Sequence, residues 1–160
     1  MKNLTPVTGM LCSLLISPVQ AASANELTRE RVVEINGALI AAMEDKNFAA
    51  YDQYLYDGTE VWIDLDPAPD NELKKVPLKD FRMLAMMSLQ MADEIIIEDE
   101  ILSIQVNPED ISLTSKSTVT ISMMGEQVIE VSEGTTVYGL INGEIKILSM
   151  SSEMIASSMP

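Results

Sequence analysis

The chain has 160 residues, 47% of them hydrophobic, and a formal net charge of −15, because 25 Asp and Glu outnumber 10 Lys and Arg. This length suits one domain with its own core, and the acidity excludes nucleic acid and anionic membrane surfaces as partners. The chain has no histidine, and Cys12 is its single cysteine. Ser/His/Asp and Cys/His catalytic sets and zinc sites built on His or Cys are therefore excluded.

The first 24 residues have the pattern of a secretory signal peptide. Lys2 supplies a positive start, Leu4 to Val19 is mostly apolar, and Ala22-Ser23-Ala24 is a small-x-small cleavage pattern. The apolar run is too short and too broken by proline and glycine for a membrane span. We expect cleavage after Ala24, or alternatively after Ala21. The protein is then secreted, into the periplasm, with no cysteine and no membrane attachment left.

Helical periodicity predicts three helices. The first runs from Glu26 to Glu44 with Asn25 as its cap, and the second from Asn47 to Leu55. The third runs from Pro77 to Met91 and is apolar around most of its circumference, which is typical of a helix buried on more than one side. Between the second and third helices, alternation predicts a strand at Thr59 to Leu65.

From Asp93 onward the pattern is that of β-structure. Strands are expected at Glu94–Val106, Ile111–Met124, Gln127–Leu140 and Glu144–Met150, with a tight hairpin at Asn142-Gly143. Helices that precede a run of antiparallel strands predict an α+β fold. We expect one domain at residues 25–154, with three N-terminal helices packed on a curved, mainly antiparallel sheet that forms a cone, and a flexible tail at 155–160.

Two segments resemble a known superfamily. Ala41-Ala42-Met43-Glu44-Asp45-Lys46-Asn47-Phe48, followed by Tyr54-Leu55-Tyr56-Asp57-Gly58-Thr59-Glu60-Val61-Trp62, is similar to the helix-helix-strand opening of nuclear transport factor 2-like proteins, the SnoaL-like or cystatin-like α+β cones. Ile141 to Met150 is similar to their last hairpin and strand. The resemblance implies the cone fold. It does not imply one function, because this superfamily holds isomerases, dehydratases, cyclases and members without catalysis.

Ketosteroid isomerase-like members use a carboxylate base with a Tyr and a protonated Asp as oxyanion donors. Asp64 falls close to the position of the base, but the first helix has no tyrosine. Tyr138 would be a donor only with a different geometry. An isomerase- or dehydratase-like enzyme with Asp64 as base is therefore one alternative, although the sequence favours a protein without a catalytic set.

The sequence offers ligands for two kinds of metal site, and each set has a plainer explanation. Met83, Met87 and Met91 lie on one helix face and are of the soft ligand type that suits Cu(I), but methionine is also an ordinary core filler. Asp64, Asp66, Asp70, Asn71 and Glu72 carry oxygen ligands for Ca²⁺, but without a known calcium-loop spacing. A solvated acidic loop is the simpler interpretation. The acidic run Glu98-Asp99-Glu100 is interpreted as protection of a strand edge. We expect no metal and no cofactor.

The leading hypothesis is a non-catalytic binding or accessory domain for a small apolar or amphipathic ligand. Its pocket would lie between the helix at 77–91 and the concave sheet. The expected ligand-binding residues are Tyr54, Trp62, Asp64, Met83, Met87 and Tyr138. A homodimeric interaction module is the other alternative, formed through the outer sheet face that carries Thr114, Thr118 and Thr120.

Overall fold

Three helices and six strands follow one another in the computed structural model, which describes residues 26–64 and 72–158. The helices and strands are α1 Arg29–Glu44, α2 Phe48–Asp52, β1 Glu60–Asp64, β2 Lys74–Val76, α3 Leu78–Met91, β3 Glu94–Val106, β4 Asp110–Met123, β5 Glu126–Ile141 and β6 Glu144–Ser158. Within these ranges no helix is long and apolar enough to cross a membrane. The expected cap Asn25 and the expected signal peptide lie outside the described residues. Thr28 caps α1 instead, because its hydroxyl accepts a hydrogen bond from the backbone N–H of Arg31 at 3.2 Å.

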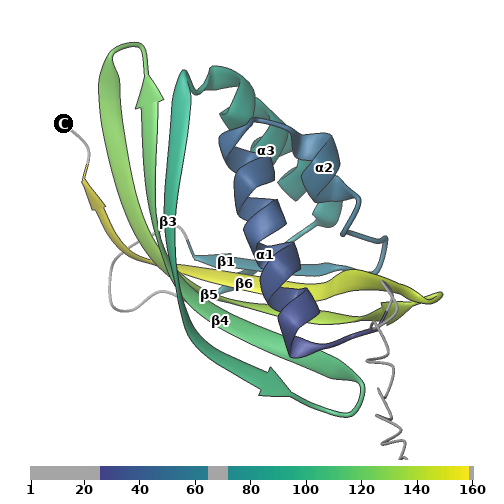
Figure 1. The fold of residues 1–160 in the computed structure, drawn as a ribbon. Coiled ribbons are helices and arrows are strands. Elements are labelled where there is room, and N and C mark those ends of the chain that lie inside the picture. The colour runs from purple at the N-terminus through teal and green to yellow at the C-terminus, as the bar shows by residue number, and fades with distance from the viewer. Residues whose placement is uncertain (1–25, 65–71, 159–160) are drawn as a thin grey trace, which may run out of the picture.

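The six strands form one sheet in the order β2-β1-β6-β5-β4-β3. Only the pairing of β1 with β6 is parallel, so the expected mainly antiparallel α+β fold is confirmed. The long strands bend strongly, and α1 lies across their concave side (Figure 1). Irregularities in register occur in β3 between Ile101 and Ser103 and twice in β6, at Leu148 and Ile155, where it pairs with β5. Such bulges bend a strand and increase its twist, which accounts for the curvature.

Two tight turns hold the long hairpins in register. Asn142 and Gly143 have φ of 52° and 80°, and Met124 and Gly125 have φ of 52° and 86°. Two consecutive residues with positive φ match the right-handed twist of the strands they join. Asn and Gly adopt this conformation readily, whereas Met124 is a non-glycine residue there and its side chain is 97% exposed. The expected hairpin at Asn142-Gly143 is confirmed.

The core lies between α1 and one end of the concave face. Val32, Ile35 and Leu39 of α1 pack there against buried side chains of three strands, namely Ile111, Leu113, Tyr138, Ile145 and Ile147. A smaller cluster of Leu89, Ala92 and Ile95 joins the end of α3 to β3. Glu44, the last residue of α1, connects this helix to the edge strand β3, because its Oε1 accepts a hydrogen bond from the backbone N–H of Ile97 at 2.9 Å. The helix thus covers part of the sheet edge that the acidic run was expected to protect.

Three expectations about the elements need correction. Leu89 is the only buried residue of α3, and Met83 and Met87 are 52% and 50% exposed, so this helix is not buried on several sides. The helix that faces the concave sheet is α1 (Figure 1). β1 lies between α2 and α3 as expected, and the short strand β2, which was not expected, follows it. β6 continues to Ser158 and pairs with β5 there, where a flexible tail was expected from residue 155.

Candidate functional site

A cavity of about 310 Å³ lies under α1 on the concave side of the sheet. α1 supplies Asn36, Leu39, Ile40 and Met43, and single residues, Tyr51 and Phe81, come from α2 and α3. The remaining wall comes from β1, β3, β4, β5 and β6. This volume is within the range of small-molecule sites. The expected pocket between α3 and the concave sheet is not observed in the described residues, because the cavity lies under α1 and Phe81 is the only α3 residue in its lining.

The cavity has two chemically different sides. Apolar side chains cover the side of the helices and β1, namely Leu39, Ile40, Met43, Tyr51, Val61 and Phe81. Hydroxyl groups cover much of the sheet side, namely Ser115, Ser117, Ser132, Thr136 and Ser152. They point inward because alternate residues of a strand share one face. A ligand held here would meet carbon on one side and hydrogen-bonding oxygen on the other.

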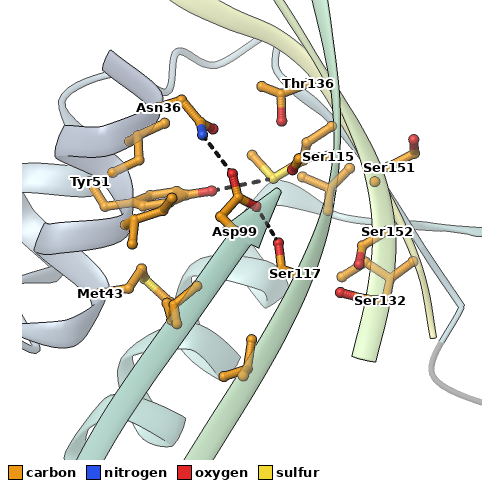
Figure 2. Close-up of a pocket in the computed structure, with 18 of the residues that line it drawn as sticks. Asn36, Met43, Tyr51, Asp99, Ser115, Ser117, Ser132, Thr136, Ser151 and Ser152 are labelled. Atoms are coloured by element: carbon orange, nitrogen blue, oxygen red, sulfur yellow. Dashed lines mark hydrogen bonds between the residues drawn. The ribbon is translucent and has the colours of Figure 1, made fainter. Parts of the chain in front are cut away.

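Asp99 is the one carboxylate in the described lining of this cavity. Its Oδ2 accepts a hydrogen bond from the Asn36 amide at 3.0 Å, and its Oδ1 accepts one from the Ser117 hydroxyl at 2.6 Å (Figure 2). The two donors come from α1 and β4, and β3 carries Asp99 itself. These bonds fix the carboxylate in the space between the helix and the sheet.

Tyr51 stands beside this group with its hydroxyl turned into the cavity (Figure 2). The hydroxyl donates to the sulfur of Met150 across 3.7 Å, a weak hydrogen bond. The Tyr51 ring stacks on Phe48 at 5.9 Å between centroids and contacts Phe81 at 6.5 Å. Burial raises the pKa of Tyr51 to about 12, so its hydroxyl stays protonated at neutral pH.

Of the six expected ligand-binding residues, only Trp62 lines this cavity. Lys75 lies over its indole ring at 5.6 Å and forms an ion pair with Glu60. This ion pair holds the pKa of Glu60 below its usual range. Tyr54 belongs to a different depression beside Gln53 and Lys146, and Asp64 is 8% exposed at the end of β1. The Asp64 carboxylate is not part of the cavity lining, as a catalytic base would have to be.

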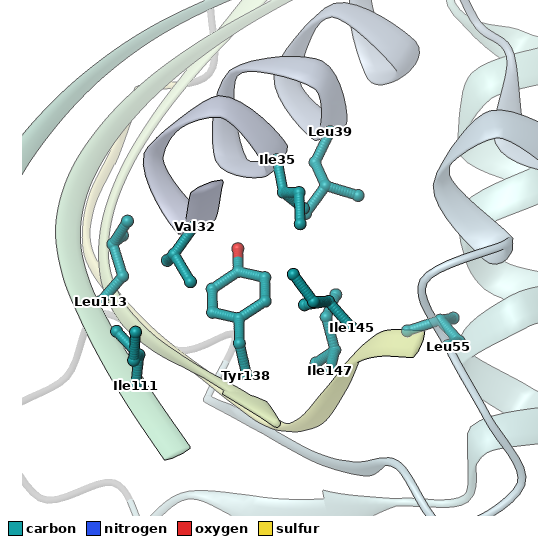
Figure 3. Close-up of a cluster of buried hydrophobic side chains, with 9 residues drawn as sticks. All are labelled: Val32, Ile35, Leu39, Leu55, Ile111, Leu113, Tyr138, Ile145 and Ile147. Atoms are coloured by element: carbon teal, nitrogen blue, oxygen red, sulfur yellow. The ribbon is translucent and has the colours of Figure 1, made fainter. Parts of the chain in front are cut away.

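Tyr138 is fully buried in the core, and Val32 and Ile35 lie close to its ring (Figure 3). Its hydroxyl has no hydrogen-bond partner among the described residues. Burial is the main cause that raises the pKa of Tyr138, and the nearby Tyr51 and Asp99 add to it. Tyr138 is therefore a core residue and does not reach a ligand in the cavity.

The residues of the two alternative metal hypotheses are only partly within the described residues. In residues 26–64 and 72–158 there is no group of three or more His, Cys, Asp or Glu side chains that could hold a metal ion. Asp66, Asp70 and Asn71 of the calcium hypothesis lie outside those ranges. Met83 and Met87 are exposed on α3, whereas Met150 lies inside the cavity.

The residues that sequence reasoning missed are Asn36, Asp99 and the inward hydroxyls. The alternation in β4 placed Ile111, Leu113 and Val119 on one face, and Ser115 and Ser117 fall on that same face. Two serines at core-facing positions between apolar residues were the available signal, because a polar residue on a buried face needs a partner or a solvent-filled space.

No protein-family profile matches the sequence, and no curated protein matches it. The structure is nevertheless similar to solved structures. One is titled a putative scytalone dehydratase from Novosphingobium aromaticivorans, with a TM-score of 0.65 and 9% identity over 81% of this chain and 85% of that chain. Another is a hexachlorocyclohexane dehydrochlorinase from Novosphingobium barchaimii, with a TM-score of 0.62 and 10% identity over 82% and 89%.

A third similar structure is a nuclear transport factor 2-like protein from Cytophaga hutchinsonii. Its TM-score is 0.61 and its identity is 12%, over 81% of this chain and 100% of that chain. At such identities the likeness concerns the fold and leaves the function open. The chain therefore has the α+β cone fold of the nuclear transport factor 2-like superfamily.

Proposed function

We propose that this protein binds a small amphipathic molecule in the cavity under α1 and does so without catalysing a reaction. The observation that carries the proposal is the division of the cavity wall into an apolar side, formed mainly by helices, and a hydroxyl-rich side on the sheet. A few polar groups placed against an apolar wall are the usual make-up of a site for a small ligand. The ligand's carbon body would lie against Leu39 and Phe81, and its polar groups would face the serines.

Binding is favoured over catalysis by the ionisable groups that are present. Asp99 and Tyr51 are the ionisable side chains of the described cavity lining. Proton transfer is fastest when the pKa of the acid or base lies near the working pH, and that of Tyr51 is about 12. Both oxygens of Asp99 already accept hydrogen bonds from neutral donors. Similar structures titled dehydratase or dehydrochlorinase show that the fold accommodates enzymes. The alternative that uses Asp64 as base has no support from this geometry.

Secretion into the periplasm is part of the proposal, and it rests on the pattern of residues 1–24. N-terminal sequencing of protein recovered from the periplasm of its host tests it directly. A first residue at position 25, or at position 22 for the alternative cut, is the expected result. Full-length chain recovered from the cytoplasm would contradict it.

The binding proposal is tested with naphthylmethanol, a neutral probe with an apolar body and one hydroxyl group. Isothermal titration measures its affinity for the wild-type protein and for two serine-to-leucine variants of β4. Ser115 lines the cavity, whereas Ser112 faces the convex side of the same strand. Ser115→Leu fills part of the cavity and is expected to weaken binding roughly tenfold or more.

Ser112→Leu is the matched control, because it adds the same side chain to the other face of the sheet. Its affinity is expected to equal that of the wild type, and circular dichroism verifies that both variants are folded. Absence of binding by the wild type, or equal binding by the Ser115→Leu variant, would show that the cavity is not the site.

A further inference from the structure

The Asp99 carboxylate lacks a cationic partner. The ion pairs in the described residues are Arg31–Glu34, Lys75–Glu60, Arg82–Asp52 and Lys146–Glu144, and none of them includes Asp99. Its bonds come from the neutral Asn36 amide and the neutral Ser117 hydroxyl. A carboxylate has about four lone-pair positions for hydrogen bonds, so two remain for a further donor.

An uncompensated carboxylate among apolar side chains is costly, and a positive charge beside it removes most of that cost. Asp99 is partly buried between α1 and β4. Lys75, which lies over the Trp62 ring, is already paired with Glu60. The protein therefore leaves a carboxylate in its cavity whose charge no described side chain neutralises.

The surroundings of Asp99 suit an ammonium group attached to an apolar body. Tyr51 and Phe81 present aromatic rings to the same cavity, and the face of an aromatic ring attracts a cation. The inward serine hydroxyls can accept the remaining ammonium hydrogens. The net charge of −15 also raises the local concentration of cations around the molecule and repels anions.

We infer that the ligand of this cavity is a small amine, cationic at neutral pH, whose ammonium group binds Asp99 and whose apolar body lies against the α1 side. This inference rests on the proposed function and gives its ligand a chemical class. The ammonium donates to the free lone pairs of Asp99, so Asn36 and Ser117 keep their bonds and act as positioning residues for the carboxylate.

Three probes of one shape test the inference: naphthylmethylamine, naphthylmethanol and naphthoate, which are cationic, neutral and anionic at pH 7. Isothermal titration against the wild-type protein is expected to show the amine binding roughly tenfold or more tighter than the alcohol, since a charge-assisted hydrogen bond is about twice as strong as a neutral one. Naphthoate is expected to bind more weakly than the alcohol. The affinity for naphthylmethanol measures binding in the cavity, and the ratio of the amine affinity to the alcohol affinity measures the preference for a positive charge.

Asp99→Asn removes the charge with little change of shape, and Glu98→Gln is the matched control. Glu98 is exposed, neighbours Asp99 on β3 and faces the opposite side of the sheet, so its variant changes the net charge equally without touching the cavity. We expect Asp99→Asn to bind amine and alcohol equally well, and Glu98→Gln to keep the amine preference. Binding of the alcohol by the Asp99→Asn variant shows that the cavity of this variant is intact. If Asp99→Asn does not fold, Asp99→Ser is used in its place.

Equal binding of amine and alcohol by the wild type would overturn the amine inference and leave the proposed function standing. An equal loss of preference in Glu98→Gln would also overturn it, because the preference would then arise from overall charge. Failure of the wild type to bind either the amine or the alcohol would instead contradict the proposed function.

Discussion

Replacing Tyr138 by phenylalanine is expected to stabilise the protein. The Tyr138 side chain is fully buried, and its hydroxyl has no hydrogen-bond partner in the described residues. In the unfolded chain that hydroxyl bonds to water, so folding loses this bond without a replacement. Burial of an unsatisfied polar group costs about 1–3 kcal/mol. Phenylalanine keeps the ring that packs among Val32, Ile35 and Leu113 and removes that cost.

The expected gain for Tyr138→Phe is about 1 kcal/mol in the free energy of unfolding, which corresponds to a rise in Tm of roughly 3–5 °C for a domain of this size. Urea unfolding followed by circular dichroism measures it, with the slope of the unfolding free energy against urea concentration unchanged. Tyr51→Phe is the control, because it removes only a weak bond to sulfur and is expected to change stability by less than about 0.5 kcal/mol. A loss of 1 kcal/mol or more in Tyr138→Phe would refute the reasoning, because the hydroxyl would then be well bonded.

Three further predictions concern the helices, the sheet and pH. Leu89→Ala should cost about 2–5 kcal/mol in urea unfolding, whereas the exposed Met87→Gln should change stability by less than about 0.5 kcal/mol; equal losses would contradict the orientation of α3. Gly134→Ala should destabilise the protein by about 1–3 kcal/mol, because the added Cβ would lie 2.5 Å from a backbone oxygen of β6. Gly37→Ala is the control and should stabilise by about 0.5–1 kcal/mol, because its Cβ would have no atom within 4 Å and the residue lies inside a helix. A Gly134→Ala variant as stable as the wild type would contradict this packing. The free energy of unfolding should fall by up to about 2 kcal/mol as pH rises from 10 to 12, because the Tyr51 hydroxyl loses its proton near pH 10 in the unfolded chain and at about 12 in the folded chain. A free energy of unfolding that stays constant in urea titrations across this range would contradict the burial of the Tyr51 hydroxyl.

The fold could be predicted from the sequence where local chemistry determines structure. Asn142-Gly143 specifies a tight hairpin by itself, and the alternation of β4 placed Ile111 and Leu113 on the core face as observed. The alternation of apolar residues in β3 and β4 gave their limits to within one residue. β2 was missed because its three residues, Lys74–Val76, carry no alternation of their own and depend on pairing with β1.

The orientation of α3 could not be predicted, because apolar side chains occur around most of its circumference. Periodicity identifies the buried side of a helix only when the other side is polar. The prediction that Met83 and Met87 line a cavity is therefore wrong, because in the tertiary structure Leu89 faces the core and the two methionines are exposed.

Asp99 could not be predicted as a cavity residue, because both of its neighbours in the sequence are acidic. Glu98-Asp99-Glu100 has the pattern of a solvated acidic run. Because side chains alternate along β3, however, Asp99 faces the concave side of the sheet and the two glutamates face the convex side. Its partner Asn36 lies 63 positions away in the sequence. The hydrogen bond between these two residues depends on how α1 crosses the sheet, and a local sequence pattern does not predict that crossing.

The central claim is that the cavity under α1 holds a small ligand, and the methionine methyl groups provide its most direct test. Met43 and Met150 line the cavity, whereas Met83 and Met87 are exposed on α3. In protein labelled with ¹³C at the methionine methyl groups, titration with naphthylmethylamine is expected to shift the signals of Met43 and Met150 with one common dissociation constant and to leave those of Met83 and Met87 in place. Shifts confined to Met83 and Met87, or no shift at Met43 and Met150, would contradict the claim.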